Sequence, residues 1–154
     1  MTEQKNELYL QNQSLEQNEG KGDDALFVSL LNSMQNVKWW FKNGDCGREY
    51  LAVKYFNEEE NNYSLFYPEW LIQMKDGRLG IFDVKIDKGD SLASTKQQAK
   101  ALAKRIEEMN AFAKSNLFFG GFIVKVNEDW YYNDSMDYQP YSDNPEAWKP
   151  FASI

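Results

Sequence analysis

The chain contains no histidine, and this absence removes several common kinds of active site. Ser-His-Asp and Cys-His nucleophilic sites are excluded, as are zinc sites of the usual Cys/His kind. Any metal ion would have to be held by oxygen atoms, which favours Mg²⁺, Mn²⁺ or Ca²⁺. The single cysteine, Cys46, cannot form a disulfide within the chain, and it favours a reducing, cytoplasmic location.

Long apolar runs are also missing, and none approaches the ~20 residues of a membrane span. The polar N-terminus predicts no secretory signal. With 42% apolar and 16% aromatic residues, 154 residues suit one folded domain. We expect the Gln/Asn/Glu-rich residues 1–22 to form a flexible tail and residues 23–154 to form the domain.

The net charge of −7 is unevenly spread along the chain. Residues 1–24 carry six acidic residues against two basic ones, and residues 127–154 carry six against one. The stretch between them holds 12 acidic and 14 basic residues. Because the acidity belongs to the two ends, the composition leaves room for a basic face that meets nucleic acid.

Hydrophobic spacing predicts an α/β protein with the order helix, strands, hairpin, helix, strand. Asp23 or Asp24 fits a cap of the first helix, and Ser94 with Gln97 fits a capping box at the second. This order implies a mixed sheet with a helix on each face. The expected helices are 25–34 and 95–113; the expected strands are 37–41, 48–56, two within 66–85, 117–126 and 130–132; residues 57–62 are an expected loop.

The most informative stretch is 66–85, where two apolar runs flank Lys75-Asp76-Gly77. An Asp-Gly turn between apolar runs is a strong hairpin signal. The first run carries Glu69 and the second carries Asp83, which Lys85 follows two residues later. Because a buried charge must be paired or bound to a metal, we expect these three groups to interact.

The length of the turn decides whether these charged groups can meet. A two-residue loop would place Glu69 and Asp83 on opposite faces of the hairpin. A three-residue loop, with Gly77 in the left-handed conformation, places Glu69 opposite Asp83 and puts Lys85 on the same face. A slip of one residue reverses every side chain. We predict the three-residue loop, because it alone brings the charges together without a further bulge.

Two carboxylates and a lysine in this arrangement suit metal-assisted cleavage of a phosphodiester bond. Glu69 and Asp83 would hold Mg²⁺ or Mn²⁺, with the Val84 carbonyl as a further oxygen ligand. The metal would activate a water molecule and neutralise charge on the phosphate. Lys85 would orient that water or stabilise the developing charge. The alternative is a structural ion pair between Asp83 and Lys85.

The same residues resemble the signature of the PD-(D/E)XK nucleases: Pro68-Glu69, thirteen residues, then Asp83-Val84-Lys85. Over roughly residues 23–150, the chain is similar to the C-terminal endonuclease region of type III restriction subunits and related DEAD/DEAH helicase-nucleases. The segments that carry this similarity are Trp39-Trp40-Phe41-Lys42-Asn43-Gly44-Asp45, Gly47-Arg48-Glu49-Tyr50, Phe66-Tyr67-Pro68, Lys75-Asp76-Gly77-Arg78 and Trp148-Lys149-Pro150.

This resemblance implies a restriction-endonuclease-like αβββαβ core, in which helices flank a mixed sheet, and a Mg²⁺-dependent endodeoxyribonuclease activity. It implies a further acidic ligand from the first helix, which falls on Asp24, with Asp23 as the alternative. It also implies that the second helix lines the DNA, through the stretch that contains Lys96, Gln97, Gln98 and Lys100. DNA and a helicase motor or modification subunit are the implied partners.

Several alternatives remain open at the level of sequence. Asp24 could equally be a helix cap instead of a metal ligand. The stripe of Lys96, Lys100 and Lys104 could face solvent instead of DNA. Arg48 could be an exposed strand residue without a role in the site. The family's usual Asp after proline is Glu69 here and its usual Glu is Asp83, so both charges are kept with exchanged lengths. These features also fit a catalytically inactive module that binds DNA or docks a partner, and more distantly an acidic mimic of DNA.

A nuclease region of this kind normally follows a helicase motor. No Walker motif G-x-x-x-x-G-K-[ST] occurs in the chain, so it cannot use ATP itself. We therefore expect either a free-standing relative or a fragment of a larger helicase-nuclease.

Overall fold

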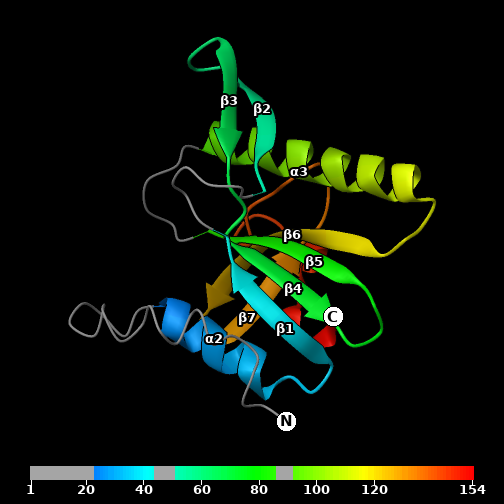
Figure 1. Ribbon diagram of the computed structural model, residues 1–154. Coiled ribbons are helices and arrows are strands. Elements are labelled where there is room, and N and C mark those ends of the chain that lie inside the picture. Colours follow the sequence, from blue (N-terminus) through cyan, green and yellow to red (C-terminus); the bar gives the residue numbers. More distant parts are fainter. Residues whose placement is uncertain (1–22, 44–50, 86–91) are drawn as a thin grey trace, which may run out of the picture.

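The computed structural model describes residues 23–43, 51–85 and 92–154. Within these ranges a six-stranded sheet lies between two helices, and a separate two-stranded sheet packs beside the longer helix (Figure 1). The elements are α2 (Asp23–Ser33), β1 (Val37–Lys42), β2 (Val53–Asn57), β3 (Asn62–Phe66), β4 (Trp70–Met74), β5 (Leu79–Val84), α3 (Leu92–Ala113), β6 (Phe118–Val126), β7 (Asp129–Asn133), η1 (Pro145–Ala147), β8 (Lys149–Pro150) and η2 (Phe151–Ser153).

The large sheet has the strand order β1-β4-β5-β6-β7-β8. Strands β5 and β6 run parallel, whereas the other neighbouring strands run antiparallel. A parallel pair needs a crossover connection, and α3 lies in that connection. The prediction of a mixed α/β sheet with a helix on each face is therefore confirmed. Among the described residues, no helix is both long and apolar enough to cross a membrane.

The two helices bury different faces of the sheet. Phe27 of α2 packs against Trp70 of β4, with ring centroids 5.1 Å apart, in a cluster that also contains Phe82. Leu102 of α3 belongs to a second cluster, which contains Ile81. Because successive side chains of a strand point to opposite faces, Ile81 faces α3 while Phe82 faces α2. The same alternation assigns Asp83 to the side of α3.

A glycine allows β6 to approach β5 closely. Gly120 has a φ of +146°, and a Cβ atom at this position would lie 1.9 Å from the carbonyl oxygen of Ile81. No other residue fits there without moving the strand. This close approach explains the first of the two glycines in an otherwise apolar strand.

The largest difference from the expected elements is the hairpin of β2 and β3. We predicted one strand over 48–56 and a loop over 57–62, but β2 pairs with the unpredicted strand β3 from Val53 opposite Phe66 to Asn57 opposite Asn62. The Asn57 side chain accepts hydrogen bonds from the amides of Glu59 and Glu60, which closes the turn. Residues 48–50 lie outside the described residues.

The start of the second helix also differs from the prediction. Leu92 is already helical, so Ser94 and Gln97 lie inside α3, and the predicted capping box is wrong. Instead, Oε1 of Gln97 accepts a hydrogen bond from the amide of Glu58 at 3.2 Å and thus ties α3 to the β2–β3 hairpin. Two further differences are small. The short strand β8 was not predicted, and the first helix begins at Asp23 instead of residue 25.

Candidate active site

The turn between β4 and β5 is the predicted three-residue loop. The Met74 amide donates to the Arg78 carbonyl at 2.8 Å, and the Gly77 amide donates to the Met74 carbonyl at 3.1 Å. Gly77 has a φ of +96°, which is the left-handed conformation that the prediction required. The strand pairs run from Gln73 opposite Leu79 to Trp70 opposite Phe82. The predicted register is therefore confirmed, and its next pair is Glu69 with Asp83.

This register brings the predicted charged residues together beyond the end of β4. The backbone amide of Glu69 donates a hydrogen bond to Oδ1 of Asp83 at 3.2 Å. Nζ of Lys85 lies 3.1 Å from Oδ2 of Asp83. The Asp83 side chain is only 8% exposed and that of Lys85 only 16%, so the pair is largely removed from water. Each carboxylate oxygen of Asp83 thus has a contact from a different predicted site residue.

Helix α3 contributes a residue to this site. Oε1 of Gln98 accepts a hydrogen bond from Nζ of Lys85 at 3.0 Å, and Gln98 itself is buried. The same ammonium group lies 5.0 Å from the centroid of the Phe122 ring. Lys85 is therefore fixed by β5, β6 and α3 together. The resemblance to nucleases predicts that Gln98 contacts DNA, whereas in the structure Gln98 is buried and bonded to Lys85.

Glu69 has a strongly perturbed electrostatic environment. The pKa of Glu69 is raised from 4.5 to about 7, chiefly by burial and in addition by the nearby carboxylates of Asp83 and Asp24. Lys42 and Lys85 act in the opposite direction and lower the pKa. The Glu69 carboxyl group is thus close to half-ionised at neutral pH, and an additional positive charge would favour its ionised form.

Asp24 lies near this group but is engaged with a lysine. Lys42, the last residue of β1, donates a hydrogen bond to Asp24 and lies 5.7 Å from the centroid of the Trp70 ring. Asp23, the alternative ligand, pairs with Lys125 at 3.5 Å. Within the described ranges, no three Asp, Glu, His or Cys side chains gather closely enough to hold a metal ion. The predicted metal ligand Asp24 therefore neighbours the Glu69–Asp83 pair without joining it.

Comparisons with known proteins add no relative. Neither a family model, nor a curated protein, nor a solved structure matches the chain. The geometry of Glu69, Asp83 and Lys85 is therefore the main indication of a function.

The predicted DNA contacts on α3 divide into two kinds. Lys96 and Lys100 are exposed, as is Lys104 one turn further on, so the lysine stripe faces solvent and its contact with DNA stays a prediction. Arg48 lies outside the described residues. We expected Trp39, Trp40 and Trp70 to lie in the core instead of stacking on bases. Trp40 and Trp70 are buried there, whereas Trp39 is 37% exposed.

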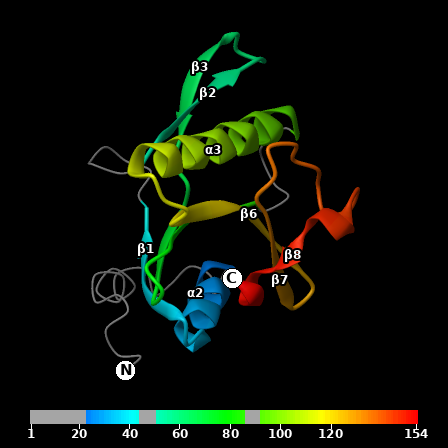
Figure 2. The same ribbon diagram turned by 90° about the vertical axis from the view of Figure 1, so that its right-hand side faces the viewer.

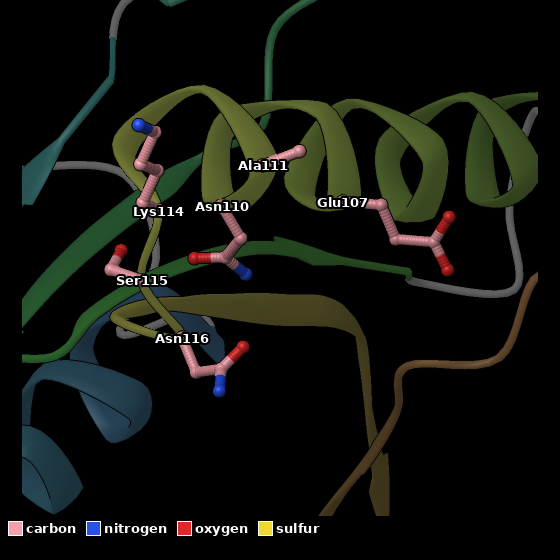
Figure 3. A pocket seen from close by; sticks show the side chains of 6 residues that line it. All are labelled: Glu107, Asn110, Ala111, Lys114, Ser115 and Asn116. Carbon is pink, nitrogen blue, oxygen red and sulfur yellow. The ribbon is translucent and has the colours of Figure 1, made fainter.

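An open depression of about 410 Å³ lies elsewhere, at the C-terminal end of α3. Its lining includes Asn110, whose side-chain amide donates a hydrogen bond to the Phe118 carbonyl and accepts one from the Phe118 amide, each at 2.9 Å. The charged side chains of Glu107 and Lys114 point away from one another (Figure 3). Because its central polar group is already used to join α3 to β6, this depression is not a candidate active site.

Proposed function

We propose that the chain is a Mg²⁺- or Mn²⁺-dependent DNA endonuclease domain of the PD-(D/E)XK type, related to the endonuclease region of type III restriction and helicase systems. The main support is the contact of Asp83 with both the Glu69 amide and Lys85 in the register that such a site requires. The order α2-β1-β4-β5-α3-β6 agrees with an αβββαβ core into which β2 and β3 are inserted. On this proposal the protein acts in the cytoplasm.

The donor set suits a hard cation. Glu69 and Asp83 supply carboxylate oxygens, and Val84, between Asp83 and Lys85, supplies a candidate carbonyl. A bound cation would activate water and neutralise charge on the scissile phosphate. The raised pKa of Glu69 supports this assignment, because perturbed carboxyl groups in a partly open site are typical of functional positions.

The remaining residues have roles that follow from their positions. Lys85, held by Asp83 and Gln98, presents a fixed ammonium group to the attacking water or to the phosphate. The exposed Lys96 and Lys100 of α3 would contact phosphates of the DNA backbone, which makes binding weaker at high salt.

Cleavage of plasmid DNA in the presence of Mg²⁺ or Mn²⁺ tests the proposal. We expect Asp83→Asn and Lys85→Met each to lower the rate by about 100-fold or more, because each removes a group that acts on the reacting atoms. Lys149→Met is the matched control, since it breaks an exposed ion pair with Asp134 at 3.3 Å. Metal-dependent cleavage at the wild-type rate in both site variants would contradict the proposal.

A second candidate function is an inactive module of the same fold that binds DNA or docks a partner, such as a helicase motor or modification subunit. The ion pair of Lys42 with Asp24 favours it, because this lysine already neutralises the third carboxylate near the site. Calorimetric titration of the chelator-treated protein with Mn²⁺ separates the two candidates. Binding that Asp83→Asn abolishes supports the nuclease, whereas no binding by the folded wild-type protein supports the inactive module.

A further inference from the structure

The outer face of the β2–β3 hairpin exposes an apolar strip. Phe56, Tyr63 and Leu65 are 41%, 61% and 56% exposed. Phe56 pairs with Tyr63 and Lys54 pairs with Leu65, so all four side chains lie on one face. We call these four residues the outer ribbon face. The opposite face of the hairpin packs against α3.

The outer ribbon face is ordered in advance of any contact. The rings of Phe56 and Tyr63 meet edge to face, with centroids 5.3 Å apart. Nζ of Lys54 lies 4.4 Å from the centroid of the Tyr63 ring. In both ribbon views the turn of this hairpin lies beyond α3, on the side away from the six-stranded sheet (Figure 1, Figure 2). The strip is therefore accessible to another molecule, and little side-chain entropy is lost when it is covered.

Charge changes sign along this ribbon. Lys54 stands at its base, whereas Glu58, Glu59 and Glu60 form the exposed turn at its tip. Base and tip are four residues apart, or about 13 Å in an extended strand. A two-stranded ribbon fits the major groove of DNA, but three carboxylates at its tip would repel the phosphates. The charge pattern therefore disfavours nucleic acid as the molecule that covers this face.

We propose that the outer ribbon face binds a second copy of the chain. If two ribbons meet face to face in antiparallel orientation, a two-fold axis passes through the Phe56–Tyr63 rung. The aromatic pair then packs on the same pair of the second copy, and Lys54 faces the glutamates at the tip of the other ribbon. This arrangement is self-complementary, as a two-fold interface requires, and its centre is aromatic, as in many interfaces.

Sedimentation velocity over a range of protein concentrations tests the proposal, which does not depend on nuclease activity. We expect the wild-type chain to form dimers and the double variant Phe56→Ser/Tyr63→Ser to have a dimer dissociation constant at least about tenfold higher. Both residues are exposed, so circular dichroism should show an unchanged fold. A wild-type chain that stays monomeric, or a double variant that associates as the wild type does, would overturn the proposal.

A charge exchange tests the antiparallel orientation. Lys54→Glu alone and the triple change of Glu58, Glu59 and Glu60 to Lys should each weaken the dimer, and their combination should restore it. Phe112→Ser is the control for unspecific stickiness, since Phe112 of α3 is 94% exposed but lies off the ribbon. Three results would overturn the proposal. The combined variant could fail to recover dimer formation, or Phe112→Ser could dissociate the dimer. The third is binding of single-stranded DNA by this face of a monomer.

Discussion

The backbone of Glu69 is held on both sides by neighbouring strands. Its amide donates to Oδ1 of Asp83 at 3.2 Å, and its carbonyl accepts a hydrogen bond from the Asn43 amide at 2.7 Å. Glu69 thus lies between the ends of β1 and β5, where its side chain shares a face with Asp83. Because the backbone fixes this position, the two carboxyl groups stay close even though like charges repel.

The raised pKa of Glu69 predicts that the metal-free protein loses stability as the pH rises. With a pKa of about 7 in the folded state and 4.5 as its ordinary value, the folded chain binds more protons than the unfolded chain between these values. The contribution of Glu69 to the free energy of unfolding should therefore be fully present below about pH 4.5. It should be lost as the pH rises through about 7, a fall on the order of 2 kcal/mol when partial exposure is allowed for.

Urea denaturation in the presence of a chelator, at about pH 5 and about pH 8, measures this effect. The variant Glu69→Gln keeps the shape of the neutral carboxyl group but cannot ionise. Other groups also titrate, so the useful quantity is the pH-dependent change in the wild-type protein minus that in the variant. An equal fall in both proteins would show that Glu69 ionises without cost and that its pKa is not raised.

The contact between Gln98 and Lys85 predicts a positioning role for a residue of α3. Gln98→Met keeps the side-chain length but removes the oxygen that accepts from Nζ of Lys85. If the proposed nuclease is correct, the cleavage rate should fall by about 10- to 100-fold, because a small displacement of an active group has effects of that size. Affinity for Mn²⁺ and thermal stability should change little, since Asp83 still pairs with Lys85.

The variant Gln98→Glu separates positioning from packing. It restores an oxygen acceptor for Lys85 and should retain more activity than Gln98→Met. If both variants are equally slow, or if Gln98→Met is as active as the wild-type chain, Gln98 does not position Lys85.

The register of the hairpin was predictable from sequence because its causes are local. The Asp-Gly turn and the two-residue period of a strand left two registers open, and the need for the charged side chains to meet selected the three-residue loop. Glu69, Asp83 and Lys85 lie within 17 consecutive residues, so their meeting required no knowledge of the rest of the fold. The buried strand at 117–126 was equally predictable, since its apolar run is long and is observed as β6.

Other parts of the site depend on contacts between distant segments. Lys42 meets Asp24 from 18 residues away, and Gln98 meets Lys85 from 13 residues away, each from a different element. No spacing within one strand or helix encodes these contacts. Strand β3 was missed for another reason: Glu58, Glu59 and Glu60 resemble a long solvated loop, yet the turn that they form is short.

The left-handed conformation of Gly77 predicts a purely local cost of substitution. A Cβ atom at this position would meet no other atom within 4 Å, so Gly77→Ala creates no clash. The φ of +96° is nevertheless unfavourable for alanine, and we expect a loss of about 1 kcal/mol in the free energy of unfolding. Lys75→Ala in the same turn is the control and should change it by less than about 0.5 kcal/mol. If both variants lose the same free energy of unfolding, the left-handed backbone of Gly77 is not the cause of the loss.

Two lysines that pair with adjacent aspartates of α2 provide a matched test of the electrostatics at the site. Lys42 pairs with Asp24 and lowers the pKa of Glu69, whereas Lys125 pairs with Asp23 and is not among the groups that shift it. Removing either lysine changes the net charge by the same amount. Only the loss of Lys42, however, removes a positive charge that opposes a cation beside Glu69.

We therefore expect Lys42→Met to bind Mn²⁺ about three- to tenfold more tightly than the wild-type protein at about pH 8, where Glu69 is ionised. Lys125→Met should change the affinity by less than about twofold, because Lys125 is not among the charges that shift the pKa of Glu69. Isothermal titration calorimetry measures both. An equal increase in Mn²⁺ affinity in the two variants would mean that only the net charge of the protein matters. A weaker Mn²⁺ affinity in Lys42→Met would mean that this lysine supports the cation site instead of competing with it.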